Sequence, residues 1–248
     1  MAQPLDLTAD AQTLVAGIGP LPDLEPAERP AAIATWRGRM INEHVSARVF
    51  GAMLGQAMAA GLSPRRQTQL AEFACEELRH ARQCAAVVLA LGGQARAELP
   101  VLQRVPDHAD ADPLQALLRN VLSVCCLSET VAVALIRAET LQIGPPGLRA
   151  ALDAILADEV GHAQFGWSLF ADLHPLSADQ TGPLSAYLDT ALVHLVEHEL
   201  RHLPDHDGLG ERLQRVGVCS GRRARLLLKD TIDQVIVPGL RRFGIAVA

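Results

Sequence analysis

The chain has 248 residues, a formal net charge of −6 at pH 7 and 49% hydrophobic residues. This length suits one large domain, or one domain with extensions, and is ample for a buried core. The acidic balance excludes a general electrostatic attraction to nucleic acid or to an anionic membrane surface. We therefore expect a globular protein that binds neither nucleic acid nor membrane.

The cysteines and the N-terminus favour a cytoplasmic location. The five cysteines are odd in number and form no CxxC pair, so a disulfide framework is not expected. The first residues have neither a basic segment nor an uninterrupted apolar run, so no secretory signal is apparent. The most apolar stretch, residues 121–136, is interrupted by Glu129 and is too short and too acidic for a membrane span.

Residues 1–29 are rich in Pro, Asp and Ala and are predicted to form an arm along the domain. Four long helices follow, because apolar residues recur at helical spacing through residue 173. Ser63 is expected to cap the second helix, with Pro64 at its first position. A Gly-Pro-Pro-Gly break precedes the fourth helix. The expected ranges are about 30–60, 64–91, 114–141 and 148–173.

Two more helices and a short tail are predicted beyond the fourth helix. The helices span about 184–202 and 221–235, and the tail begins at Pro238. The chain is therefore divided into an N-terminal arm (1–29), a four-helix domain (30–173) and a C-terminal helical extension packed on that domain (174–248).

Four glutamates and two histidines fall on the apolar faces of the four long helices. Glu and His stand three residues apart in two of the helices, and each of these pairs is preceded by a lone Glu on another helix. Residues three apart project from the same face, so each pair can bind one metal ion. Burying four carboxylates without cations would be costly, and we expect no arginine on these faces to offset them. The six residues are Glu43, Glu77, His80, Glu129, Glu159 and His162.

This pattern resembles the ligand set of the ferritin-like di-iron carboxylate superfamily, in which two helices give one Glu each and two give Glu-x-x-His. The segments 76–80 and 158–162 look like the paired acidic-Glu-x-Arg-His motifs of its oxygenase and desaturase branches. The resemblance implies that all six residues are metal ligands. It covers residues 30–173, and it departs from the family once, because Gly161 stands where the second motif usually has Arg.

The resemblance also implies roles for two acids that directly precede a ligand. Glu76 and Asp158 match the acids that accept the imidazole N–H of the opposite helix pair. Asp158 would then serve His80, and Glu76 would serve His162, which fixes the ring orientations. The alternative for both acids is a solvated side chain.

The loops between the four long helices are short, long and short. The long middle connection, residues 94–113, is polar and contains three prolines. Two antiparallel helix pairs joined by one crossover form a ferritin-like topology rather than a simple up-and-down bundle. We therefore predict an all-α fold: a ferritin-like four-helix bundle with a long crossover between its second and third helices.

By this resemblance we expect an O₂-activating, non-haem di-iron oxidase or oxygenase that hydroxylates, desaturates or N-oxidises an organic substrate. The cofactor would be two iron ions, with manganese as the alternative, and O₂ would be the co-substrate. The substrate, small or carrier-tethered, is not identified by the sequence. A separate donor of the ferredoxin or reductase type would supply electrons, because the chain has no flavin, nicotinamide or rubredoxin signature. A homodimer remains open.

Two other classes of function compete with this expectation. The first is metal or peroxide handling, of the ferroxidase or manganese-catalase type. The absence of CxxC pairs disfavours a rubrerythrin, and the position of Tyr187 outside the four-helix core disfavours a tyrosyl-radical protein. The second is a bundle that binds metal only structurally or has lost it, which the six intact positions disfavour.

For several other residues, we prefer the interpretation that the side chain packs in the core or faces solvent. Cys84, one turn beyond His80, is predicted to be a small buried hydrophobe, with a cavity-lining role as the alternative. A row on the fifth helix, His194, His198 and His202, is predicted to be a solvated face. Its alternatives are a second metal site or an extra histidine near the metal pair, as in the arylamine N-oxygenase branch.

The remaining features are read in the same way. Cys125 and Cys126 are assigned to core packing. The basic run from Arg222 to Lys229 is predicted to be a solvated helix face rather than a site for an acidic partner or an RNA backbone.

Overall fold

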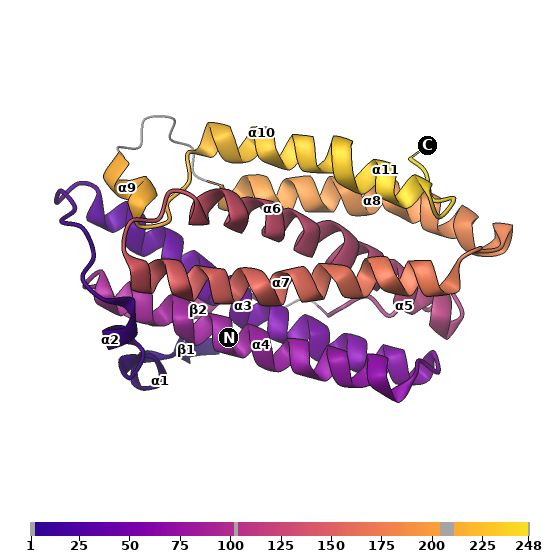
Figure 1. Ribbon diagram of the computed structural model, residues 1–248. Helices are drawn as coiled ribbons and strands as arrows, with labels where there is room; N and C mark the ends of the chain where they lie inside the picture. Colours follow the sequence, from indigo (N-terminus) through magenta and orange to yellow (C-terminus); the bar gives the residue numbers. More distant parts are fainter. Residues whose placement is uncertain (1–2, 102–103, 204–210, 248) are drawn as a thin grey trace.

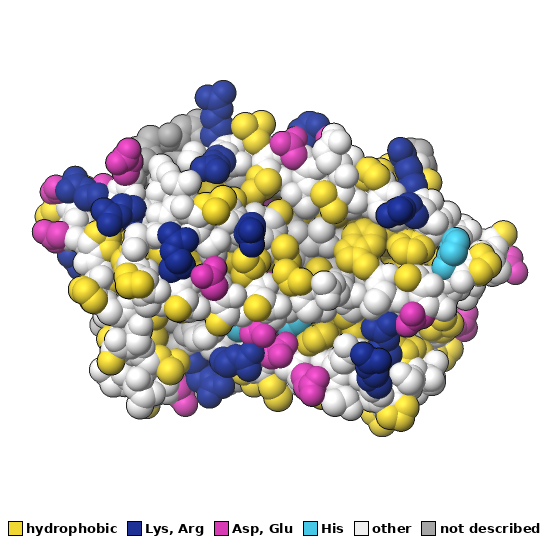
Figure 2. All heavy atoms as spheres, viewed as in Figure 1, with side chains coloured by type: hydrophobic (Ala, Val, Ile, Leu, Met, Phe, Trp, Pro, Cys, Tyr) yellow, Lys and Arg dark blue, Asp and Glu magenta, His cyan; other side chains and the backbone are white. Residues whose placement is uncertain are grey.

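The computed structural model is almost entirely helical, which confirms the all-α prediction (Figure 1). It describes residues 3–101, 104–203 and 211–247. The other positions belong to the predicted arm, crossover and C-terminal extension and lie outside the described residues. On the face seen in Figure 2, acidic and basic side chains are interspersed with apolar ones.

Helices α3, Arg29–Ala59, and α4, Pro64–Ala90, form an antiparallel pair joined by a short turn. Ser63 caps α4 as predicted, because its side chain accepts a hydrogen bond from the backbone N–H of Arg66. Gly61 in the turn has a φ of +69°, which glycine adopts without a steric penalty. The pair therefore begins and ends close to the predicted positions.

The third predicted helix is continuous but not uniform. It comprises α5, Pro113–Val121, a π-helical stretch η1, Leu122–Ser128, and α6, Glu129–Thr140. Helix α7, Pro146–Leu173, packs against both η1 and α6. Gly166 permits the close approach, since a Cβ at this position would lie 2.7 Å from the Cβ of Cys125. The π-helical stretch was not predicted from the apolar spacing.

The N-terminal arm is tied to the crossover by a two-stranded sheet. Strand β1, Gln3–Asp6, pairs antiparallel with β2, Arg96–Leu99. Helices α1, Thr8–Gln12, and α2, Val15–Ile18, then pack against α4. The predicted polar connection thus contains a strand, which anchors the arm across the α3–α4 pair.

The C-terminal quarter covers the side of α5 and α6 that is turned away from α3 and α4 (Figure 1). Helix α8, Ala178–His202, begins earlier than predicted because Ser177 and Gln180 form a capping box. Three short helical elements complete the chain around α10. Helix α10 spans Gly221–Thr231, and the three elements are α9, Glu211–Arg215; the π-helical η2, Ile232–Ile236; and α11, Val237–Arg241. The predicted tail at Pro238 is wrong, since this proline lies in the first turn of α11, where proline is tolerated.

Two clusters of buried hydrophobic residues fill the interior. One contains Phe50, Phe73 and Phe165, and the other contains Trp36 and Met40. Along α3, Glu43 lies between Met40 of one cluster and Phe50 of the other. The predicted site is therefore enclosed by apolar packing at both ends.

The helix Pro113–Thr140 is long and apolar enough to cross a membrane by length and composition alone. The prediction that this stretch is too short for a span is therefore wrong, because it belongs to a helix of 28 residues. However, 44% of its apolar window is buried inside the protein, and the core helix of a soluble protein passes the same test.

Candidate metal centre

The six predicted site residues come together midway along the long helices. Glu43 comes from α3, the Glu77–His80 pair from α4, Glu129 from the start of α6 and the Glu159–His162 pair from α7. They form two groups, in each of which the possible ligand atoms lie within 4.8 Å of one another. The groups are Glu43, Glu77, His80 and Glu159, and Glu77, Glu129, Glu159 and His162. Each group could hold a metal ion, and the two groups share Glu77 and Glu159.

Both histidines are oriented by an acid on the opposite helix. Nε2 of His80 lies 2.8 Å from Oδ2 of Asp158, and Nε2 of His162 lies 2.9 Å from Oε2 of Glu76. These are the two pairs that the resemblance implies. A carboxylate can only accept in such a hydrogen bond, so each Nε2 carries the proton and each Nδ1 faces the cluster. The α4 and α7 motifs therefore orient each other's imidazole.

One arginine serves both of these acids. Nη2 of Arg79 lies 2.6 Å from Asp158 and 3.9 Å from Glu76. The resemblance would have an arginine in the α7 motif as well, but the chain has Gly161 at that position. The arginine that contacts these two acids therefore comes from α4.

The carboxylates of the centre are buried beside one another. Burial raises the pKa of Glu77 well above its usual value, and the charges of Glu43 and Glu159 raise it further. Burial likewise raises the pKa of Glu129, with Glu159 adding to the effect. Ionised carboxylates therefore require positive charge here, from protons or from metal ions.

Without metal, the two histidines supply that charge. Burial lowers the pKa of His80, but the carboxylates of Glu159 and Glu43, which lie 3.3 and 3.4 Å from its Nδ1, outweigh it and raise the pKa to about 10. Burial also lowers the pKa of His162, but Glu159 above all outweighs it and raises the pKa to about 9. Both rings are therefore imidazolium at neutral pH in the metal-free protein, and their Nδ1 protons would leave when a metal binds.

Two buried atoms of the centre, Oε2 of Glu77 and Nδ1 of His80, have no hydrogen-bond partner among the described residues. Nδ1 of His80 lies 3.3 Å from Glu159 but is not aligned for a hydrogen bond. An unsatisfied buried polar group costs about 1–3 kcal/mol, and coordination to a cation would remove this cost. Carboxylate oxygens with imidazole nitrogens suit iron, manganese or zinc. The residues present therefore fit a pair of divalent metal ions.

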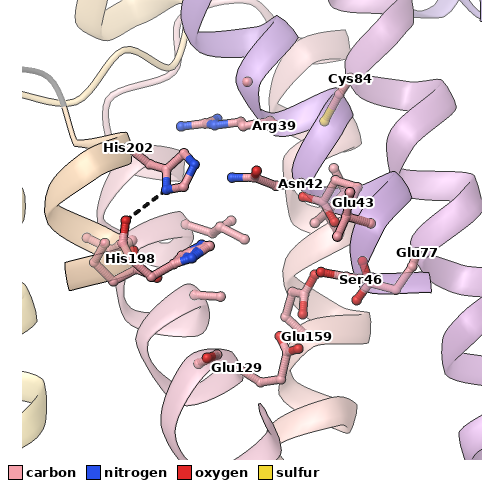
Figure 3. Close-up of a pocket in the computed structure, with 18 of the residues that line it drawn as sticks. Arg39, Asn42, Glu43, Ser46, Glu77, Cys84, Glu129, Glu159, His198 and His202 are labelled. Carbon is pink, nitrogen blue, oxygen red and sulfur yellow. Dashed lines mark hydrogen bonds between the residues drawn. The ribbon is translucent and has the colours of Figure 1, made fainter. Parts of the chain in front are cut away.

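A cavity of about 660 Å³ opens on this centre (Figure 3). Its volume lies in the range of small-molecule sites. The four glutamates of the centre line one end. The walls between the ends are largely apolar, and they include Val45, Val49, Phe50, Leu135, Ile136, Leu152 and Ile155.

The opposite end of the cavity is polar and was not predicted. Nη2 of Arg39 lies 2.6 Å from Oε1 of Glu139 and donates to the carbonyl of Gly217 at 3.1 Å. The expectation that no arginine lies on the ligand faces is wrong, because Arg39 lies one turn before Glu43 and lines the same cavity. The only local signal was a single arginine within the apolar stripe of α3, since its partner is 100 residues away.

All three histidines of the row on α8 are exposed, as the preferred interpretation has it. Two of them, His198 and His202, also line the cavity, whereas His194 does not. Nδ1 of His202 donates to the carbonyl oxygen of His198 at 2.8 Å (Figure 3). Neither ring belongs to the two candidate metal groups.

Cys125, Cys126 and the basic run agree with their preferred interpretations, whereas Cys84 shows both its preferred and its alternative role. Cys84 is fully buried and also lines the cavity. Burial, with the charge of Glu43, raises the pKa of its thiol well above the usual value, so the thiol is neutral. Cys125 and Cys126 are buried against α7. In the basic run, Arg222, Arg223 and Lys229 are exposed.

A scan against protein-family models and a search of curated proteins find no match for this chain. Function is therefore inferred from the residues themselves and from their arrangement in space.

Proposed function

We propose that the chain forms a ferritin-like four-helix bundle that binds two iron ions and acts as an O₂-activating oxidase or oxygenase. The observation that carries this proposal is a buried set of four carboxylates and two imidazoles that opens on a largely apolar cavity. The iron pair would supply the redox chemistry with O₂.

The residues of the chain have separate tasks in this function. Glu43 and Glu129 would each serve one ion, while Glu77 and Glu159, common to both groups, would hold the ions together. Four carboxylate charges would largely balance two divalent cations. The two imidazoles would bind through Nδ1, because their Nε2 atoms are engaged by Asp158 and Glu76.

The cavity favours substrate oxidation over simple metal handling. A ferroxidase needs a path for ions, whereas this centre faces a space of about 660 Å³ with largely apolar walls. Such walls exclude water and bind organic molecules. Electrons would come from a separate donor, and the setting that fits the chain is the cytoplasm. Ferroxidase or manganese-catalase activity is the alternative outcome of the tests below.

The first test is metal stoichiometry. Anaerobic loading with Fe(II), followed by removal of free metal and elemental analysis, should give two irons per chain. Glu77→Ala should bind one or fewer, because Glu77 belongs to both candidate groups. Glu72→Ala, an exposed position on the same helix, is the matched control and should still bind two. Less than about one iron in the wild type, or two in Glu77→Ala, would contradict the proposal.

The second test separates the classes of reaction. With a chemical reductant, the iron-loaded protein should consume O₂ and show little disproportionation of peroxide. Peroxide disproportionation by the manganese-loaded protein, with no O₂ consumption by the iron-loaded protein, would instead assign it to the catalase type. An optical spectrum with elemental analysis would identify the metal that the protein retains when purified.

A further inference from the structure

We propose that the polar end of the cavity binds a carboxylate, so that the substrate is an organic acid anchored by Arg39, Asn42 and His202. The statement that this acid is oxidised rests on the proposed function. Binding of the acid does not, because the anchoring residues lie outside the metal groups.

The three side chains converge from two helices. Arg39 and Asn42 are three residues apart on α3 and project from the same face. His202 reaches the same space from the end of α8 (Figure 3). Glu43 follows Arg39 by one turn, which corresponds to about 6 Å along the helix axis. A molecule anchored at Arg39 would therefore extend toward the carboxylate centre.

The guanidinium of Arg39 has binding capacity that its ion pair does not use. Glu139 and Gly217 both contact Nη2, while Nη1 is buried without a partner among the described residues. The arginine side chain is 21% exposed and that of Glu139 is 8% exposed, so a molecule in the cavity can contact the guanidinium more readily than the carboxylate of Glu139. The planar guanidinium can hold a carboxylate through two parallel hydrogen bonds.

Asn42 and His202 complete an acid-binding set. The amide of Asn42 has two N–H donors. Nδ1 of His202 donates to a backbone carbonyl, so Nε2 is left for a ligand in the cavity (Figure 3). Two more charged side chains, Arg201 and Glu199, line the cavity. Burial raises the pKa of Glu199 to about 7, which reduces the negative charge that a bound acid would meet.

A carboxylate explains these features better than a neutral polar group. An alcohol or amide would offer Nη1 only a neutral acceptor, whereas a carboxylate can accept from Nη1 and from an amide N–H of Asn42 together. The apolar walls beyond this end suit the hydrocarbon part of the same molecule. Inorganic phosphate shares the anionic chemistry but would leave those walls uncovered.

The test is a matched binding series on metal-free, full-length protein. Straight-chain carboxylates from butyrate to decanoate, and the corresponding amides, are titrated by calorimetry. At least one acid should bind ten or more times as tightly as its amide. This preference should disappear in Arg39→Met/Glu139→Gln, a double variant that leaves no unpaired carboxylate behind, and should fall several-fold in Asn42→Ala.

A second ion pair offers a matched control. Arg66 and Asp172 also lie 2.6 Å apart but do not line the cavity. Arg66→Met/Asp172→Asn should therefore bind the acids as the wild type does. Thermal unfolding of every variant shows whether it is folded.

Three results would overturn the proposal. The first is that no acid binds with a Kd below 10 mM or that amides bind equally well, and the second is that the Arg39→Met/Glu139→Gln variant keeps the preference. The third is that inorganic phosphate binds more tightly than every acid and is not displaced by them. Iron loading is measured separately: acid binding without iron binding would sink only the proposed function, and the reverse would sink only this inference.

Discussion

The two ends of the cavity deal with buried carboxylates in different ways. At the polar end, Glu139 has a counter-ion within the chain, since Arg39 lies 2.6 Å away. At the other end, the ion pairs of Glu77 and Glu159 run to His80 and His162, at distances from 3.1 to 4.0 Å. The first carboxylate is paired with a permanent charge, and the second group with charges that depend on pH.

This difference separates a structural ion pair from a binding centre. An arginine keeps its charge at any pH at which the protein is folded. An imidazolium, by contrast, can give up its proton, and a metal ion can then take its place. A cluster of buried acids with replaceable counter-charges is therefore suited to metal binding, while the Arg39–Glu139 pair is not.

The largest expected effect is that of alkaline pH on the metal-free protein. The raised pKa values of His80 and His162 stabilise the folded state fully below pH 6.5, and this stabilisation is lost as pH rises through about 9 to 10. The raised pKa of Glu77 acts in the same direction, because the carboxyl ionises first in the unfolded chain. Urea unfolding should show a loss on the order of a few kcal/mol between pH 7 and pH 10.

The metal-loaded protein is the control for this prediction, since its histidines carry no titrating Nδ1 proton. Its free energy of unfolding should change less with pH over the same range, and so should that of metal-free His80→Gln. An equal dependence on pH in metal-free wild type, metal-loaded wild type and metal-free His80→Gln would show that the histidines are not the counter-charges of the centre.

Breaking the permanent pair comes next in magnitude. Arg39→Met leaves Glu139 buried without its cation and should lower the free energy of unfolding by about 3 kcal/mol. Adding Glu139→Gln to this variant should recover most of the loss, because the second change removes the unpaired charge. The measurement is urea unfolding at pH 7. A single variant as stable as the double variant would mean that the pair contributes nothing to the fold.

The smallest effect gives the most direct comparison, because a Glu→Gln substitution should change the free energy of unfolding in opposite directions at the two ends of the cavity. In the metal-free protein, Glu77→Gln removes a crowded negative charge and should stabilise the fold by about 1 kcal/mol. Glu139→Gln removes the partner of Arg39 and should destabilise it by a similar or larger amount. Thermal and urea unfolding of both variants at pH 7 measure this; the same sign for both would end the distinction between the two regions.

The parts of the molecule that the sequence predicted well depend on local chemistry. Ser63 and Pro64 signal a helix start within a few residues, and the Glu-x-x-His spacing places both side chains on one helix face. These local signals were enough to locate the long helices and to predict that the candidate ligands lie close together along the bundle.

The parts that could not be predicted depend on distant partners. The sequence shows Arg39 only as one arginine within the apolar stripe of α3 and does not show its partner Glu139, and β1 has no partner until the crossover passes the arm. Likewise, His198 and His202 lie on an exposed helix face by spacing alone, and only the packing of α8 turns that face toward the cavity. Pairing across long sequence separations leaves no periodic pattern in one chain.

The π-helical stretch Leu122–Ser128 has a consequence for how the length of this chain can change. It separates the buried Leu117 and Leu118 from Glu129, which begins the following α-helix. A π-helical stretch holds one residue more than an α-helix needs for the same rotation, so a return to α-helical geometry at unchanged length would turn one side of the helix relative to the other by about 100°. Either the leucines would leave the core or Glu129 would leave the carboxylate cluster. A deletion of one residue within this stretch should therefore be tolerated, because it keeps both sides in register, whereas a one-residue insertion should not.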